Sequence, residues 1–240
     1  MNILAIDTTT NQLLVAVKKG DILYKNQPQT TMKHLEVALP QVDYVLNEAK
    51  IELKDLDYIA VNVGPGSFTG IRIGIATAKG ILCVNKDIKV VPVNSLEILA
   101  YNVVKQKQKQ DFMVVIPSTL EKFYSVLFKD EKQVEAKIIT KKELEEVKDI
   151  PVYSYTNSPN IEAVEDIDFI EYVEHLIKSN KTSTINDLKP VYMSLCQAEE
   201  ELLLKEKKNS GVWDFPFKQW SLWWNVWVAW KLLWRQRTYA

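Results

Sequence analysis

Apolar and polar positions near the N-terminus follow a pattern typical of short β-strands. Residues 2–7, Asn-Ile-Leu-Ala-Ile-Asp, are mostly apolar and end on an acid, which predicts a buried strand. Residues 13–18 and 22–26 predict two further strands, and Gly20-Asp21 between them is a hairpin turn signal. The three segments therefore predict a β-meander that opens the fold.

Two later segments carry apolar residues at the spacing of an α-helix. Residues 34–50 predict the first helix, although Pro40 lies inside it and predicts a kink or a later start. The second helix begins near Ile71. Each helix has one apolar stripe: Leu35, Leu39, Val42 and Leu46 on the first, and Ile71, Ile75, Ala78 and Leu82 on the second.

A glycine-rich turn precedes the second helix and follows a β-branched run at 57–63, which predicts a buried strand. Ser67 and Thr69 suit helix caps. The N–H groups at the helix start predict either an anion site or a tight turn without a ligand. The glycine spacing matches neither the dinucleotide nor the P-loop pattern. The turn consists of Gly64, Pro65, Gly66, Ser67, Phe68, Thr69 and Gly70, and Arg72 follows it.

The next segments complete a first lobe. Residues 88–92 predict a strand and residues 95–104 a helix. The run at 105–110, Lys-Gln-Lys-Gln-Lys-Gln, has no apolar periodicity and predicts a solvated link between two lobes. An RNA-contacting patch is the alternative for this run.

Strands and helices then begin again. Residues 112–116 and 123–128 predict a pair of strands, and residues 152–155 predict another strand. Residues 141–147 and 169–178 predict helices. This restart predicts an α/β duplication, without a visible repeat of individual residues.

We therefore predict a first lobe at 1–104, a second lobe at 111–205 and a separate tail at 212–240. All seven tryptophans lie after Gly211, so the tail differs abruptly in composition from the lobes. A helix there would be apolar nearly all round and short for a bilayer span. Such a helix has two interpretations: it binds a membrane interface or a partner, or the tail is a non-native extension. We favour the non-native extension.

Composition and charge exclude some classes of function. With 47% hydrophobic and 25% charged residues, the chain has the composition of a soluble globular protein. The net charge of −1 gives no basic field for nucleic acid. Cys83 and Cys196 form no disulfide or CxxC pattern, and Cys83 is expected in the core. Together with the lack of a signal peptide pattern, this predicts a cytoplasmic protein.

Few residues are suited to catalysis. His34 and His175 each stand alone on a predicted helix, without metal-ligand spacing. Asp7, at the end of the first strand, is a candidate for holding a hydrated magnesium ion on a nucleotide. Its alternative role is to cap the threonine turn that follows. Apart from this weak cofactor candidate, we predict no catalytic residue, no metal site and no cofactor.

Two stretches resemble a known family. Residues 3–9, Ile-Leu-Ala-Ile-Asp-Thr-Thr, resemble the opening of the fold shared by actin, sugar kinases and heat-shock chaperone ATPases. Residues 64–74, Gly-Pro-Gly-Ser-Phe-Thr-Gly-Ile-Arg-Ile-Gly, closely resemble the motif of the TsaB family, dimerisation subunits of the bacterial tRNA threonylcarbamoyladenosine machinery. The same family is matched at 34–36 with 39–40, at 91–96, and at 190–192 with 197–199. The match is dense over 1–104 and thin afterwards.

This resemblance implies a two-lobed, actin-like (ribonuclease H-like) α/β fold and a non-catalytic subunit. It implies pairing with a homologous catalytic TsaD-type subunit and a TsaE-type ATPase, or a homodimer when the chain is alone. The complex would modify the adenosine beside the anticodon, so the chain would meet tRNA only within it. The catalytic relative has a His-x-x-x-His metal pair, and here those positions are Ser95 and Leu99. The alternative is a metal- or nucleotide-dependent enzyme of the same fold, but no glycine between Gly80 and Gly211 is available for an adenosine pocket.

The family resemblance is incomplete in the second lobe. Pro117-Ser118-Thr119 stands where the family usually has Asp-Ala-Arg, and Met193 and Ser194 follow Tyr192 where an arginine is usual. These departures bring the contacts of the second lobe into question. For the first lobe, we predict that the two helix stripes, from Leu35 to Leu46 and from Ile71 to Leu82, pair with the helices of the partner. The alternative is that the additional apolar residues of these helices pack within the lobe.

Overall fold

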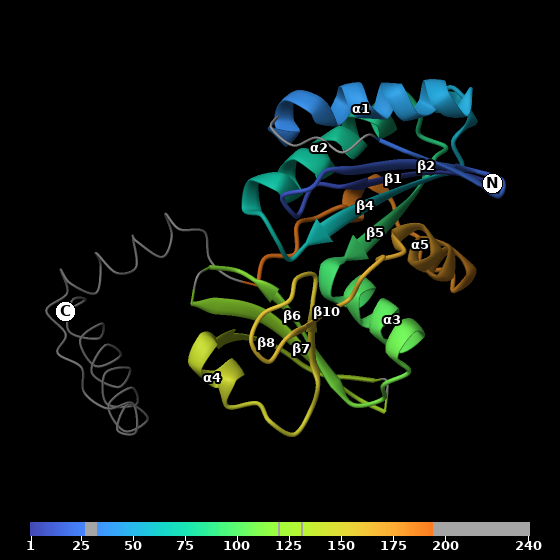
Figure 1. Ribbon diagram of the computed structural model, residues 1–240. Coiled ribbons are helices and arrows are strands. Elements are labelled where there is room, and N and C mark those ends of the chain that lie inside the picture. The colour runs from blue at the N-terminus through green and yellow to red at the C-terminus, as the bar shows by residue number, and fades with distance from the viewer. Residues whose placement is uncertain (27–32, 120, 131, 194–240) are drawn as a thin grey trace, which may run out of the picture. The chain divides into compact units, whose positions relative to one another are not determined.

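The computed structural model of the protein describes residues 1–26, 33–119, 121–130 and 132–193. These residues form two five-stranded mixed sheets, each flanked by helices (Figure 1). The predicted α/β class with two sheet-and-helix lobes is therefore confirmed. Contacts group Met1–Ser194 into one compact unit, so the lobe boundaries at 104, 111 and 205 stay a prediction. The tail at 212–240 lies outside the described residues.

The first sheet has the strand order β3-β2-β1-β4-β5. Its antiparallel half consists of β1 (Asn2–Asp7), β2 (Leu14–Lys19) and β3 (Ile22–Lys25), which is the predicted meander. Its parallel half adds β4 (Tyr58–Gly64) and β5 (Lys89–Asn94) beside β1. The carboxyl ends of β1, β4 and β5 therefore meet at one edge of the sheet.

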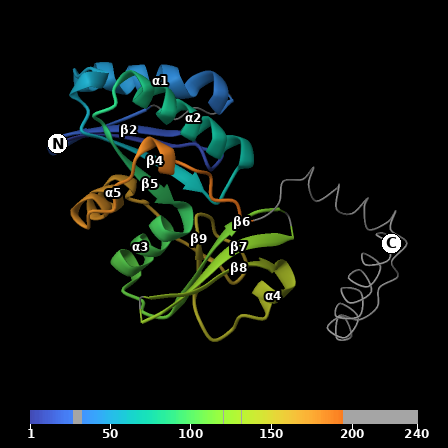
Figure 2. The same cartoon turned by 180° about the vertical axis from the view of Figure 1, so that it is seen from behind.

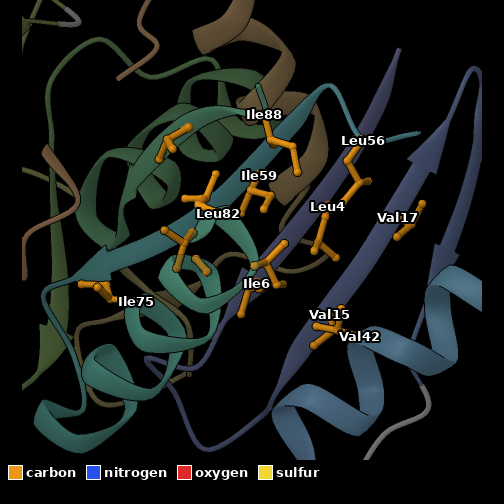
Figure 3. Close-up of a cluster of buried hydrophobic side chains, with 14 of the residues drawn as sticks. Leu4, Ile6, Val15, Val17, Val42, Leu56, Ile59, Ile75, Leu82 and Ile88 are labelled. Atoms are coloured by element: carbon orange, nitrogen blue, oxygen red, sulfur yellow. The ribbon is translucent and has the colours of Figure 1, made fainter. Parts of the chain in front are cut away.

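Helices cover both faces of this sheet. On one face lie α1 (His34–Ala49) and α2 (Phe68–Val84), whose apolar sides join the strands in the largest core cluster (Figure 3). On the other face, α5 (Phe169–Lys178) packs with β1, β4 and β5. We predicted α5 in the second lobe because of its position in the sequence, but the buried contacts of this helix lie on the first sheet. Both views place α5 beside α3 (Ser95–Lys107) (Figure 1, Figure 2).

The second sheet has the order β10-β9-β6-β7-β8. Helix α3 contributes to the core cluster on one of its faces, and α4 (Lys141–Glu145) packs on the other. Its strands are β6 (Phe112–Pro117), β7 (Lys122–Lys129), β8 (Lys132–Thr140), β9 (Val152–Ser154) and β10 (Glu162–Ala163). Two short 3₁₀ turns, Leu53–Asp55 and Ile185–Asp187, complete the described elements.

The predicted link at 105–110 is partly wrong. Helix α3 continues through Lys107, because ion pairs with residues later in the chain hold its last turn. Lys105 forms an ion pair with Glu171, and Lys107 forms one with Glu162. The carboxylates neutralise two of the three lysines of the run, which weakens the alternative of an RNA-contacting patch.

Two local expectations also need correction, and one strand had no prediction. Helix α1 begins at His34 and includes Pro40, so the helix does not start later. Cys83 is exposed and does not belong to the core. Strand β8 had no prediction, because seven of its nine residues are exposed on an edge strand and show no apolar alternation.

Candidate functional site

The glycine turn packs tightly against the residues that follow β1. A methyl group at Gly70 would overlap the carbonyl oxygen of Thr8, and one at Gly66 would lie 2.7 Å from the carbonyl oxygen of Thr9. Gly64 has a φ of +106°, a conformation that other residues rarely adopt. The glycines therefore allow the start of α2 to approach the β1 loop at backbone distance.

Hydrogen bonds close the same contact. The Ser67 N–H donates to the carbonyl oxygen of Thr9 (2.8 Å), and the Thr8 hydroxyl donates to the carbonyl oxygen of Gly70 (2.7 Å). Ser67 is the N-cap, as predicted, and its hydroxyl accepts from the Gly70 N–H (3.1 Å). Thr69 lies inside the helix and does not cap it. These internal bonds support the tight-turn alternative for the motif.

Asp7 is engaged in the same region. Its Oδ1 accepts from the backbone N–H (2.8 Å) and the hydroxyl (2.7 Å) of Thr9, and its Oδ2 accepts from the Asn62 amide (2.8 Å). The first of these bonds is the predicted cap of the threonine turn. Burial raises the pKa of Asp7, while the bonds from Thr9 and Asn62 and the nearby His34 act in the opposite direction. Asp7 thus has the contacts of a structural carboxylate.

Asn62 connects this carboxylate to the neighbouring strands. Its side chain is fully buried, and its Oδ1 accepts from the Gly64 N–H (3.0 Å) and the Ser95 hydroxyl (2.9 Å). The Tyr155 hydroxyl donates to the carbonyl oxygen of Ser95 (2.9 Å). Burial, reinforced by the charge of Asp7, raises the pKa of Tyr155 well above its usual range. This polar network ties the ends of β1, β4 and β5 together and includes a residue from the second lobe.

The resemblance places the metal pair of a catalytic relative at the positions of Ser95 and Leu99, and neither side chain is an imidazole. Ser95 is buried in the network just described, and Leu99 is fully buried in the apolar cluster on the second sheet. His34 is half-buried at the start of α1, and His175 is exposed beside Tyr101 and Tyr172. Across the part of the chain that the structure describes, no three His, Cys, Asp or Glu side chains gather as metal ligands.

Most of the predicted partner stripe is not on the surface. Six of its eight residues lie in the core of the first lobe, with exposed fractions of at most 6%. A side chain that is buried within its own lobe cannot contact a partner, so the interface prediction is wrong for these six positions. They are Val42, Leu46, Ile71, Ile75, Ala78 and Leu82.

Only the first two stripe residues are exposed. Leu35 is 74% exposed and Leu39 is 54% exposed, one turn apart on α1. On α2, Arg72, Ala76 and Gly80 are exposed, also at intervals of one turn. We call these five residues the outer face of α1 and α2.

The structure also brings together two motifs that sequence reasoning left apart. The Tyr192 ring stacks on the Phe68 ring with centroids 4.7 Å apart. The Arg72 guanidinium carbon lies 3.9 Å above the centre of the Phe68 ring, and its Nε donates to the Tyr192 hydroxyl (2.9 Å). We call Phe68, Arg72 and Tyr192 the aromatic clamp. The only sequence signal was the resemblance, which contained both motifs but no contact between them.

A pocket of about 480 Å³ lies elsewhere, at the start of α3. Its walls are mainly apolar, and Glu97 and Lys137 are its charged lining residues. None of the predicted site residues lines it. The apolar walls come from Leu96, Val126, Phe128, Ile138, Val191 and Met193.

None of the described helices combines the length and the apolar character that a membrane crossing requires.

Comparison with known families gives the decisive observation. The family model described as TsaD, tRNA N6-adenosine threonylcarbamoyltransferase, matches residues 26–212, which is more than half of the chain. The chain belongs to this family. The match includes the glycine turn, the outer face and the aromatic clamp.

Within the family, several of the similar curated proteins are TsaB proteins. The tRNA threonylcarbamoyladenosine biosynthesis protein TsaB of Buchnera aphidicola from Schizaphis graminum is 37% identical over 122 residues, 51% of this chain and 58% of that protein. TsaB of Bacillus subtilis is 41% identical over 103 residues, 42% of this chain and 44% of that protein. These matches confirm the resemblance to TsaB. The chain spans about half the length of the curated relatives it matches.

The fold agrees with that of a solved structure. YeaZ from Pseudomonas aeruginosa superimposes with a TM-score of 0.63 at 20% identity, over 80% of this chain and 99% of that chain. At this identity, the likeness shows the shared fold alone. The predicted two-lobed, actin-like architecture is confirmed.

Proposed function

We propose that this chain is a non-catalytic scaffold subunit in tRNA threonylcarbamoyladenosine biosynthesis. It pairs with a homologous, TsaD-type catalytic subunit and works with a TsaE-type ATPase. It meets tRNA only within that complex, acts in the cytoplasm and forms a homodimer when the partner is absent. The biosynthetic role follows the printed names of its TsaB relatives.

The observation that carries the pairing is the outer face of α1 and α2. Leu35 and Leu39 expose large apolar side chains on adjacent turns, although the inner side of the same helix is fully packed. On α2 the exposed positions include the small residues Ala76 and Gly80, which permit close approach of a partner helix. An apolar face of this kind is typical of a helix-to-helix interface.

The geometry around Asp7 supports a non-catalytic role. Among the described residues, the three donors to the Asp7 carboxylate come from Thr9 and Asn62, so the carboxylate works as an internal cap. Ser95 and Leu99 offer no imidazole where the catalytic relative has its metal pair. These features favour a subunit that takes part in the biosynthesis by binding a partner and not by catalysis.

The second candidate function is an enzyme of the same fold, because the matching family model describes a transferase. A catalytic chain would transfer the threonylcarbamoyl group, or hydrolyse ATP, without a TsaD-type subunit. Assays of the isolated chain therefore separate the two candidates.

The main test mixes the chain with the TsaD-type and TsaE-type proteins of its own organism. Light scattering after gel filtration measures pairing, and incorporation of labelled threonine into tRNA measures transfer. Leu39→Arg places an unpaired charge in the proposed interface and should weaken pairing at least about 100-fold. Val134→Arg, on exposed strand β8, is the matched control because Val134 is similarly exposed at 56%.

The proposal predicts that Leu39→Arg loses both pairing and transfer, while Val134→Arg keeps both. Full transfer by a folded Leu39→Arg variant would refute the proposed interface. Transfer by the isolated wild-type chain would refute the non-catalytic role and favour the enzyme.

A further inference from the structure

The aromatic clamp contains a fixed cation on the surface of α2. Arg72 is exposed, and it is the one arginine among the described residues. Its guanidinium rests on Phe68, which lies one turn earlier on the same helix, and its Nε is held by the Tyr192 hydroxyl. Two contacts to rigid rings fix the position of a side chain that is flexible in most exposed arginines.

The remaining donors of this guanidinium have no partner in the described part of the chain. Arg72 forms no ion pair there, and its one hydrogen bond uses Nε. The two terminal nitrogens of an arginine form a planar fork that matches the two oxygens of a carboxylate or the oxygens of a phosphate. The clamp therefore holds an anion receptor in place while leaving its binding edge open.

The surrounding charges decide between these two anions. Helix α1 carries Glu36, Asp43 and Glu48 and no lysine or arginine, and α2 carries only Arg72 and Lys79. Nucleic-acid contacts rely on several cations acting together, and the two helices have more acids than bases. A single fixed arginine beside an apolar face is typical of a protein interface, where arginine is enriched.

We propose that the aromatic clamp receives an Asp or Glu carboxylate of the catalytic partner subunit. This inference rests on the proposed function and assigns a specific polar contact to the outer face. The apolar residues Leu35 and Leu39 supply buried area, and Arg72 fixes the orientation of the partner. Tyr192 is a positioning residue, because it acts through Arg72.

The test measures the dissociation constant for the catalytic subunit by titration calorimetry at low and high salt. Arg72→Gln removes the charge and should weaken binding about 10-fold or more at low salt. Arg72→Lys keeps the charge but loses the fork and the Nε bond, and should recover only part of this loss. Tyr192→Phe retains the stack on Phe68 but removes the acceptor, and should weaken binding about threefold.

Lys86→Gln is the control, because it removes one positive charge from an exposed turn residue beyond the C-terminal end of α2, at the opposite end of the helix from Arg72. It should change binding less than about twofold. The clamp variants should have the same melting temperature as the wild type, since Arg72 is exposed. The carboxylate itself is found by charge exchange: Arg72→Glu should bind a partner in which one Asp or Glu has become Arg.

Each outcome has a clear meaning. If Arg72→Gln binds like Lys86→Gln while Leu39→Arg abolishes pairing, the proposed function stands and the clamp inference is refuted. If Arg72→Gln pairs normally but lowers the affinity of the assembled complex for tRNA, the clamp binds phosphate and the inference is also refuted. If the wild-type chain does not pair, both proposals fail.

Discussion

Helix α2 presents two very different sides. Toward the sheet, Ile71, Ile75 and Leu82 are almost completely buried, and Gly70 touches the backbone of the β1 loop. Away from the sheet, Arg72 and the small residues one and two turns later are exposed. Helix α1 shows the same division between its buried valines and the exposed Leu35 and Leu39.

The difference shows that an apolar stripe identifies the side of a helix that is buried, without telling whether its own sheet or a partner buries it. In this chain the sheet covers nearly the whole stripe, because five strands and two helices share one core. What remains exposed is a smaller surface, with two leucines and a fixed arginine, and this is the surface that we propose for a partner.

The largest effect is expected at the centre of the inner side. Ile75→Arg would bury an unpaired charge in the first-lobe core and should lower the free energy of unfolding by about 4 kcal/mol or more. Many domains are stable by only about 5–15 kcal/mol, so the loss removes a large part of the total stability and the variant should melt well below the wild type. Circular dichroism melting measures this. A folded Ile75→Arg variant with wild-type stability would contradict the placement of Ile75 in the core.

The second effect concerns the glycine turn. Gly70→Ala forces a methyl group against the Thr8 carbonyl and should destabilise the protein by about 3 kcal/mol. The control is Gly80→Ala, ten residues later on the same helix, where nothing lies within 4 Å of the new methyl group. It should stabilise by up to about 1 kcal/mol through helix propensity. Urea unfolding of both variants measures the contrast, and equal effects would refute the close-packing role of the turn.

The third effect is a pH dependence of the free energy of unfolding that comes from Asp7. Because the pKa of Asp7 is raised in the folded protein, the folded state binds its proton more tightly than the unfolded state. The contribution of Asp7 therefore favours folding at low pH and is lost as the pH rises from its ordinary pKa of 3.8 through the raised one. Asp7→Asn should remove this slope from a series of unfolding curves.

Glu143 is the comparison with the opposite sign. Bonds from the backbone and hydroxyl of Thr140 lower its pKa, so its contribution is present at neutral pH and is lost as the pH falls. Glu143→Gln should therefore change the acid limb in the opposite direction to Asp7→Asn. Slopes of the same sign in the two variants would contradict the burial of Asp7.

The smallest effect on stability is expected on the outer side. Leu39→Arg should change the free energy of unfolding by less than about 0.5 kcal/mol, because the side chain is 54% exposed. The same substitution type thus separates the two sides: at Ile75 it should strongly destabilise the fold, and at Leu39 it should affect only partner binding. Thermal melting of the isolated variant is the measurement, and a large loss of stability would mean that Leu39 is buried in the protein as it exists in solution.

The two lobes differ in how well local patterns predicted them. In the first lobe, buried strands and amphipathic helices gave strong periodicity, and every predicted element is present within a few residues. In the second lobe, β8 was missed because an exposed edge strand needs no apolar alternation. The helix at 169–178 was predicted, but its docking on the first sheet was not, because a pattern does not name the surface that it contacts.

The candidate site shows the same limit at single residues. Ser67 was predicted as a cap from its position, since a cap depends on neighbours in the chain. The stack of Tyr192 on Phe68 joins residues that lie far apart in the sequence, and no spacing rule contains that contact. Cys83 looked like a core residue from its helix position, yet it is exposed near the end of α2.

The sequence alone determined the order of strands and helices in the first lobe, the glycine turn and the resemblance to TsaB, because these depend on residues close together in the chain. Only the tertiary structure decided which apolar residues remain exposed, that Asp7 caps internally, and that Arg72 is held by the Phe68 ring and the Tyr192 hydroxyl. The physical reason is that burial and side-chain contacts depend on the number and position of distant neighbours. A local pattern specifies the side of an element that needs covering, and the folded chain determines what covers it.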